Sequence, residues 1–208
     1  MDAWEMVRDE RIELADLADT LTAEQWDTPS LCTRWRVRDV VAHVIEAATV
    51  TKGQMVAGAF RAGFRINTML DRQARRLGAS PTEELARSLR ATAASRNLPP
   101  GVKPSNLAMD VLVHTQDIRR PLGCSAAIPE ARLRAVADDL LISPGIMGVK
   151  KRIAGLRLCA SDIDWSTGAG PEVTGPAEAL IMAMAGRGAA LADLSGPGTA
   201  TLASRFPA

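Results

Sequence analysis

The sequence predicts an α+β protein, with an up-down four-helix bundle over residues 1–145 and a small α/β domain over residues 146–208. Three observations lead to this prediction. Apolar residues recur at helical spacing through the first part. Clusters of Pro and Gly separate these periodic segments. Beyond residue 145, short segments with strand-like alternation follow the long helical ones.

The first helix is expected over residues 2–21, where apolar side chains form a stripe: Trp4, Val7, Ile12, Leu14 and Leu17. Residues 27–35 contain Pro and several hydroxyl residues and are expected to form a loop. A second helix is predicted over residues 37–60, because apolar residues repeat on one face: Val37, Val40, Val41, Val44, Ile45 and Ala48. A basic helical segment should continue over residues 61–77.

Three more helices are expected before residue 145. Ser80 is placed to cap a helix that runs to about residue 96, and Glu83 would complete a capping box. A fourth long helix is predicted through residue 120, with Ser105 or Asn106 as its cap. Residues 129–142 have the pattern of a further helix.

The last part of the chain has a different sequence pattern. Residues 156–165 alternate as a strand does, and residues 175–186 form a short apolar helical segment. Residues 199–206 are predicted to form a final strand, after a turn at Ser-Gly-Pro-Gly. The chain should therefore end in a small sheet with one helix.

Charge and composition exclude several classes of function. The 25 basic and 24 acidic residues give a net charge of +1, so neither nucleic acid nor an anionic membrane is an expected partner. No apolar run approaches the roughly 18 residues of a membrane span. The charged N-terminus lacks the apolar core of a signal peptide. Three Cys without a CxxC pair fit a reducing cytosol, so a cytoplasmic location is expected.

Imidazole chemistry in this chain depends on two residues, His43 and His114. Asp110 and His114 are four residues apart on the predicted helix that ends near residue 120, so both project from one face. A carboxylate and an imidazole at this spacing can bind a single metal ion. Asp117 lies three residues further and could accept a hydrogen bond from the ring nitrogen that does not bind the metal.

His43 occupies the edge of the apolar face on the second helix, beside Val40 and Val44. Helical bundles build metal sites from side chains on facing helices. Two His and one carboxylate leave an open position, as in catalytic zinc sites, and the same set suits non-haem iron. A packed histidine and a local Asp–His hydrogen bond are the structural alternatives for these residues.

Three motifs carry a resemblance to a known family. A Leu-Cys-x-x-Trp loop (Leu31 to Trp35) leads into a helix that bears Asp39 and then His43. An acid-x-x-x-His-x-x-Asp pattern follows on a later helix. The third motif lies near the C-terminus: Asp164-Trp165, Gly168, Gly170, Gly175-Pro176, Gly186-Arg187 and Leu194-Ser-Gly196. In this order the motifs resemble the mycothiol-dependent maleylpyruvate isomerase family, part of the wider group of DinB-like metal-binding bundles.

The resemblance implies a divalent metal, with zinc as the first choice, bound by His43, Asp110 and His114. Water or a thiol would take the remaining position, and the thiol would be mycothiol or a similar low-molecular-weight compound. One departure stands out. Family members often have Glu as the acidic ligand, whereas Asp110 is shorter by one methylene.

A thiol-dependent reaction fits such a site. A thiol has a pKa of about 8.5, and metal coordination favours the nucleophilic thiolate. In an isomerase the thiolate would add to an activated cis double bond, allow rotation and then leave; in a transferase the adduct would be released. The sequence therefore predicts a metal- and thiol-dependent isomerase or transferase that acts on a small-molecule electrophile, as a monomer or a homodimer.

Further residues have two interpretations each. Arg187 and Arg205 are candidates for binding carboxylates of substrate or cofactor, because guanidinium pairs with them in bidentate fashion, or they stabilise the fold. Cys32 lies in an apolar loop and is expected to be inert. Trp26 and Trp35 are expected to pack this loop onto the bundle.

Two other functions compete with the thiol-dependent enzyme. One is a non-enzymatic, metal-stabilised protein that binds a ligand or a partner. The other is a metal hydrolase, in which Glu46 or Asp117 would act as the general base. A metal with an open coordination position that faces a cavity would favour an enzyme over the binding protein.

Overall fold

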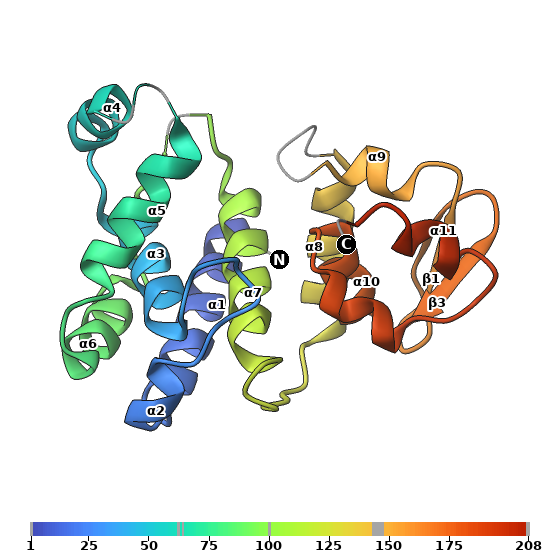
Figure 1. The fold of residues 1–208 in the computed structure, drawn as a ribbon, viewed down its shortest axis with the longest axis horizontal. Helices are drawn as coiled ribbons and strands as arrows, with labels where there is room; N and C mark the ends of the chain where they lie inside the picture. The colour runs from blue at the N-terminus through green and yellow to red at the C-terminus, as the bar shows by residue number, and fades with distance from the viewer. Residues whose placement is uncertain (1, 62, 64, 100, 143–147, 207–208) are drawn as a thin grey trace. The chain divides into compact units, whose positions relative to one another are not determined.

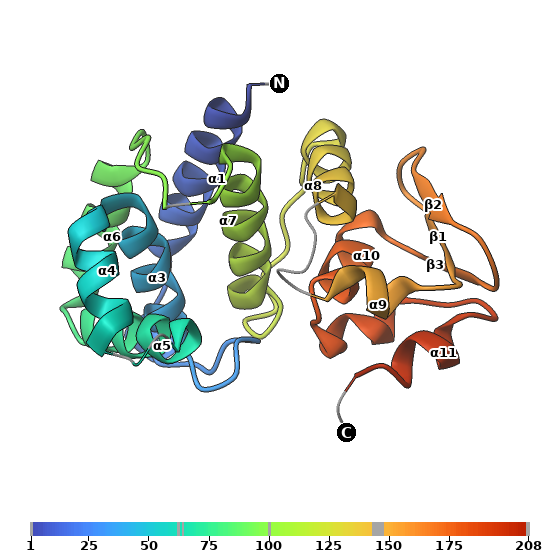
Figure 2. The same ribbon diagram turned by 90° about the horizontal axis from the view of Figure 1, so that it is seen from above.

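The computed structural model describes residues 2–61, 63, 65–99, 101–142 and 148–206. The chain divides into two compact units, Met1–Ser125 and Ala126–Ala208, which Figures 1 and 2 show in sequence colours. The sequence places the boundary at residue 145 instead. The difference comes from α8 (Glu130–Ile142), which packs against a helix of the second unit.

In the described part of the first unit, the elements of regular secondary structure are all helices. Its elements are α1 (Ala3–Ala18), α2 (Ala23–Trp26), α3 (Val37–Thr49), α4 (Lys52–Arg61), α5 (Ile66–Leu77), α6 (Thr82–Thr92) and α7 (Pro104–Arg119). The four bundle helices are α1, α3, α6 and α7: α1 packs on α6 and α7, and α3 packs on α6 and α7. Figures 1 and 2 both show α1 beside α7. With the small sheet of the second unit, this arrangement confirms the predicted α+β class.

The core of the bundle surrounds α3. Its apolar side chains are almost fully buried, together with those of neighbouring helices: Leu14, Val37, Val40, Val41, Val44, Leu85, Leu89, Val111 and Ile118. Burying one such side chain contributes about 1.5–3 kcal/mol. This packing fixes α3 against α6 and α7, and it determines which residues of α3 face α7.

The predicted helix over residues 37–60 is interrupted. Val50 has an extended backbone (φ −60°, ψ 127°) and ends α3. A new helix start follows, because the Thr51 hydroxyl accepts a hydrogen bond from the Gln54 amide (3.2 Å) while the Gln54 side chain accepts one from the Thr51 amide (2.8 Å). This reciprocal capping starts a separate helix, and the apolar stripe behind the prediction lies wholly within α3, since it ends at Ala48.

The predicted helix caps also differ from the observed ones. Pro81, rather than Ser80, occupies the cap position of α6, with no side-chain hydrogen bond. The cap of α7 is Lys103, and Asn106 contributes from the third helical position by accepting a hydrogen bond from the Lys103 amide (3.2 Å). Both helices thus begin close to a proline, whose fixed φ suits the first turn.

The second unit contains a three-stranded sheet. In the order β2 (Ser166–Gly168), β1 (Arg157–Ala160), β3 (Glu172–Gly175), β1 pairs antiparallel with β2 and parallel with β3. Its helices are α8, α9 (Val149–Ile153), α10 (Ala177–Met184), a 3-10 turn (Gly188–Asp193) and α11 (Thr199–Ala203). Buried apolar side chains of α10 face α8 and the sheet.

The predicted final strand over residues 199–206 is wrong, because this segment contains helix α11. Its amides bond within the helix, as from Leu202 to the Gly198 carbonyl (3.0 Å), and Leu202 is its one buried apolar anchor. The strand-like pairing that β3 makes at this edge is instead with Ser195, opposite Thr174. Among the described residues, no helix is both long and apolar enough to cross a membrane.

Gly78 provides a test of the packing between α3 and α5. A Cβ at this position would clash with Oδ1 of Asp39 and lie 3.0 Å from the Ala74 carbonyl oxygen. Asp39 is buried and accepts a hydrogen bond from the Arg36 amide (2.9 Å), so it cannot easily move. We expect Gly78→Ala to lower the free energy of unfolding by about 1–3 kcal/mol, measured by urea denaturation.

Gly53 of α4 is the matched control, because a Cβ there would meet no atom within 4 Å. Replacing a helical Gly with Ala stabilises a helix by roughly 0.5–1 kcal/mol. Gly53→Ala should therefore leave stability unchanged or raise it. Equal stability of the two variants would contradict the packing described for Gly78.

Candidate metal centre

The loop between α2 and α3 is fastened to α7 by its backbone. The Leu31 amide donates a hydrogen bond to the Asp117 carbonyl (3.0 Å), and the Ser30 amide donates to the Trp35 carbonyl (2.9 Å). Arg34 adopts the left-handed region (φ 71°), which turns the chain sharply between Cys32 and Trp35. Both side chains are thereby placed beside the facing edges of α3 and α7.

His43, Asp110 and His114 come together at these edges. Asp110 Oδ2 lies 3.6 Å from His43 Nε2, and Asp110 Oδ1 lies 3.5 Å from His114 Nε2. One potential ligand atom from each residue falls within 4.8 Å of the other two. The two rings have centroids 5.0 Å apart and meet edge to face. The structure thus brings together the three residues singled out in the sequence, from two helices.

Asp117 orients the His114 ring by contacting its Nδ1, the ring nitrogen on the side away from Asp110. Its Oδ2 lies 3.0 Å from His114 Nδ1, and the carboxylate is fully buried. This arrangement leaves Nε2 of His114 directed toward Asp110. A carboxylate that holds the outer nitrogen of a metal-binding imidazole is the common support for such a ligand.

Cys32 is closer to the centre than the sequence suggests. Its thiol donates a hydrogen bond to Asp117 Oδ2 (3.0 Å) and lies 3.5 Å from His114 Nδ1. Cys32, His114 and Asp117 form a second group of potential metal ligands that shares one imidazole with the first. The available signal was the position of Cys32 in the motif directly before the helix that bears His43.

Trp35 lines the centre as well as packing the loop. Its ring lies 5.1 Å from that of His43 and 6.1 Å from that of His114, centroid to centroid. The indole N–H donates to Asp71 Oδ1 of α5 (3.1 Å). Asp71 carries no sequence pattern that would have linked it to the site.

The electrostatic environment favours positive charge on His114. Burial lowers the pKa of this imidazole, but the Asp110 carboxylate, the hydrogen bond with Asp117 and the Cys32 thiol raise it, and the net shift is well above the ordinary value of 6.5. Groups that stabilise a proton on this ring also suit a divalent cation. Metal and proton would therefore compete for His114.

Arg11 of α1 places a second charge near Asp110. Its side chain is fully buried, and Nη1 donates to the Ser95 carbonyl (2.8 Å). Burial lowers the pKa of the guanidinium, while the Asp110 carboxylate raises it. The positive charge of Arg11 helps to keep Asp110 ionised, as a metal ligand must be.

Arg187 and Arg205 contact the backbone of the second unit. Arg187 Nη1 donates to the Ala185 carbonyl (2.8 Å), and Arg205 Nη2 donates to the Ala154 carbonyl (2.7 Å). Arg205 also donates to the Arg152 carbonyl. These bonds support the fold-stabilising interpretation of both residues, and their role in binding carboxylates stays a prediction.

Comparison with known proteins agrees with the motif pattern. Residues 7–100 match the family model of the mycothiol maleylpyruvate isomerase N-terminal domain. These residues, just under half of the chain, therefore have the sequence pattern of this family's N-terminal domain. The match runs from α1 to the segment after α6 and includes Cys32 and His43, whereas Asp110 and His114 lie beyond it. The family is named for an enzyme, so the expectation of an enzyme is confirmed at that level.

Two solved structures share the fold. One is a mycothiol-dependent maleylpyruvate isomerase, 15% identical, with a TM-score of 0.65 over 95% of this chain and 92% of that one. The other is a histidine-to-alanine mutant of a mycothiol-dependent maleylpyruvate isomerase, 14% identical, with a TM-score of 0.64 over the same shares. A search of curated proteins found no match. The structural likeness confirms the bundle with its C-terminal α/β part.

Asp117→Asn tests the support of His114. In the metal-free protein we expect the His114 pKa to lie above its ordinary value and to fall in this variant, because a hydrogen-bonded carboxylate is removed. Nuclear magnetic resonance titration can follow this shift with little ambiguity, since the chain has two histidines. Asp16→Asn, an exposed change on α1, is the control. An unchanged His114 pKa in Asp117→Asn would contradict the described contact.

The same shift makes stability depend on pH. Because the folded-state pKa of His114 is raised, its contribution to stability is complete below the unfolded pKa near 6.5 and is lost as pH rises through the folded value. Metal-free protein should therefore lose stability as pH increases above about 6.5, and Asp117→Asn should show a weaker trend. Thermal unfolding across this pH range measures both.

Proposed function

We propose that this chain is a metal-dependent enzyme that uses mycothiol, or a similar low-molecular-weight thiol, to isomerise or conjugate a small electrophilic substrate. The observation that carries the proposal is the meeting of His43, Asp110 and His114 at one point. The family match supports the thiol, and the activity named for the solved relatives favours isomerisation over conjugation.

The donor set fits a divalent metal. Two imidazole nitrogens face separate oxygens of one carboxylate, at 3.5 and 3.6 Å, so a modest inward movement would let all three bind one ion. His43 Nδ1 is buried without a hydrogen-bond partner among the described residues, so its outer nitrogen lacks the support that Asp117 gives His114. Two His and one carboxylate are typical of catalytic zinc, and non-haem iron is the second candidate.

The chain's own residues would hold, orient and shield the reacting groups. His43, Asp110 and His114 would bind the metal, and Asp117 would keep the proton on Nδ1 of His114. Trp35 would cover one side and limit access of water. When bound, the metal would supply a Lewis acid that favours the thiolate form of the cofactor at neutral pH.

A structural metal role has less support. Structural zinc sites are usually closed by four protein ligands, and the group formed by His43, Asp110 and His114 has three. Cys32 could reach the centre only by leaving Asp117, to which its thiol donates. The family match also gives no support to a non-enzymatic binding protein.

Metal content of purified variants tests the ligand set. His43→Ala, Asp110→Ala and His114→Ala should each lose stoichiometric metal, measured by plasma mass spectrometry, with the helical circular dichroism retained. Asp110→Glu should keep the metal, because it offers the same carboxylate on a longer side chain. Asp16→Ala removes an exposed acid and is the control. Full metal content in all three alanine variants would contradict the proposal.

Cobalt substitution tests the thiol. Titrating the cobalt-loaded protein with mycothiol should produce thiolate-to-cobalt charge-transfer absorption, because the sulfur would bind the metal directly. The band should be absent with a thioether derivative of the same compound, which cannot form a thiolate, and in His114→Ala. A titration without any such band would remove the thiol from the proposed reaction.

The product distinguishes isomerase from transferase. With a cis-configured electrophile, an isomerase would return the thiol unchanged and yield the trans compound. A transferase would yield a thioether that mass spectrometry detects. Either product, formed only with metal and thiol present, agrees with the proposed class of enzyme, and turnover without thiol would contradict it.

A further inference from the structure

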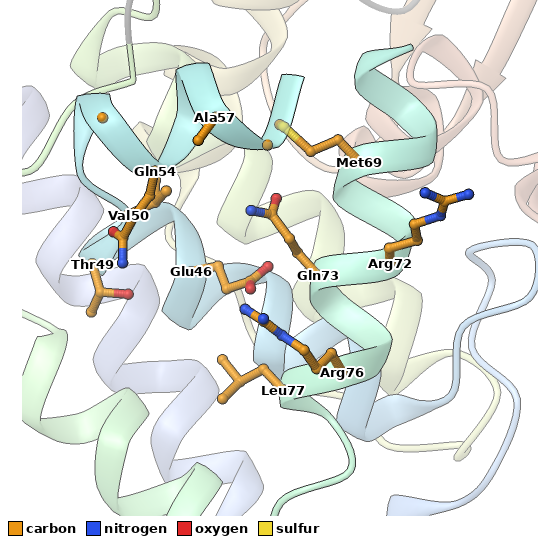
Figure 3. Close-up of a pocket in the computed structure, with 12 residues that line it drawn as sticks. Glu46, Thr49, Val50, Gln54, Ala57, Met69, Arg72, Gln73, Arg76 and Leu77 are labelled. Carbon is orange, nitrogen blue, oxygen red and sulfur yellow. The ribbon is translucent and has the colours of Figure 1, made fainter. Parts of the chain in front are cut away.

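The first unit contains a cavity whose described lining includes none of the three proposed metal ligands. It has a volume of about 700 Å³ and is bounded by the C-terminal half of α3, by α4 and by α5 (Figure 3). Its polar lining comes from all three helices: Glu46 and Thr49 from α3, Gln54 from α4, and Arg72, Gln73 and Arg76 from α5. A small molecule of about a dozen heavy atoms would fit a space of this size.

Opposite charges line opposite walls of this cavity. Glu46 projects from α3 toward the side chains of Gln73 and Arg76, which extend from α5 (Figure 3). Arg72 lies one turn before Arg76 on the same helix. Within the described part of the chain, no ion pair of 4.0 Å or less joins Glu46 to either arginine. Glu46 and Arg76 therefore share a space without a direct ion pair, although the charge of Arg76 acts on the Glu46 carboxyl group.

One oxygen of the partly buried Glu46 carboxylate has no hydrogen-bond partner among the described residues. This oxygen, Oε2, is itself buried. Burial raises the pKa of Glu46 to about 7, although the charge of Arg76 acts in the opposite direction. A donor group of a ligand would satisfy this oxygen and favour the ionised form.

The wall formed by α4 leaves room for such a ligand. Gly53 and Ala57 present little or no side chain to the cavity, and a Cβ on Gly53 would meet no atom within 4 Å. Apolar side chains also line the cavity, among them Val50, Met69 and Leu77. The polar groups that face one another across the cavity are the Glu46 carboxylate, the Arg76 guanidinium and the side-chain amide of Gln73 (Figure 3).

We propose that this cavity binds a small zwitterion, a free amino acid or a dipeptide, whose ammonium group donates to Glu46 and whose carboxylate is held by Arg76, the guanidinium that extends toward Glu46 (Figure 3). Guanidinium pairs with carboxylate in a planar, bidentate fashion, and charge-assisted hydrogen bonds of this kind are the strong ones. The proposal requires neither metal nor thiol, so it is independent of the proposed reaction. Glu46 follows His43 by three residues on α3, which places the cavity next to the metal centre.

Calorimetry on the full chain, without added thiol, tests this site. The probes are L-leucine, L-methionine and glycyl-L-leucine, and the controls are N-acetyl-L-leucine, which lacks the ammonium group, and L-leucinamide, which lacks the carboxylate. We expect at least one zwitterion to bind and both blocked compounds to bind at least tenfold more weakly. Equal binding of blocked and free compounds, or no binding of any zwitterion at millimolar concentration, would overturn the proposal.

Matched variants locate the binding. Glu46→Gln and Arg76→Gln should each weaken zwitterion binding at least tenfold, whereas Arg75→Gln, an exposed neighbour on α5 outside the cavity, and Glu84→Gln, an exposed acid on α6, should not. Arg76 is itself exposed, so Arg76→Gln should fold normally even if Glu46→Gln does not. Unchanged affinity in Arg76→Gln would overturn the proposal. Metal content and the cobalt titration are measured separately, so failure here leaves the proposed function untouched.

Discussion

The buried contact between α3 and α7 is the constraint on which the metal centre depends. Val40, Val41 and Val44 hold α3 in the core, and Val111 and Ile118 do the same for α7. His43 and Asp110 lie at the margins of these apolar faces, so packing the faces brings the polar margins together. The energy that positions the ligands therefore comes from hydrophobic burial, not from the ligands themselves.

Each ionisable side chain at the metal centre lies next to a group of opposite charge or a hydrogen-bond partner. Asp110 lies between two imidazoles, with the buried Arg11 guanidinium acting on the same carboxylate, and Asp117 lies behind His114. Such groups are costly to bury unless each has a compensating partner. A divalent cation would complete this pattern, because it would bind the nitrogens and oxygens that now face one another at 3.5–3.6 Å.

How far the sequence could predict this site depends on how local each contact is. The i, i+4 spacing of Asp110 and His114 and the i, i+3 spacing of Asp117 are properties of one helix, so they can be read directly. The approach of His43 depends on tertiary packing, and the helical bundle with its family resemblance was needed to predict it. The motif put Cys32 just before the helix that bears His43, but its contact with Asp117 could not be predicted, because that contact depends on the bond from the Leu31 amide to the Asp117 carbonyl.

The same distinction explains the differences in the fold. The apolar stripe of the helix predicted over residues 37–60 ends at Ala48, and the local capping by Thr51 and Gln54 starts a separate helix after it. The segment after Ser195 has too few apolar residues to separate a strand from a short helix, and the structure shows α11 there. The boundary between the units lies before α8, not after it, because α8 packs on α10. Helical periodicity predicts that α8 is a helix but not which unit it packs against.

The ligand set is tested most directly by X-ray absorption spectroscopy of the zinc-loaded protein without added thiol. The account predicts a first shell of nitrogen and oxygen at about 2.0–2.1 Å, with the outer-shell scattering of two imidazoles. A sulfur at about 2.3 Å would instead place the metal at Cys32, His114 and Asp117. That result would contradict the assignment of His43 and Asp110 as ligands.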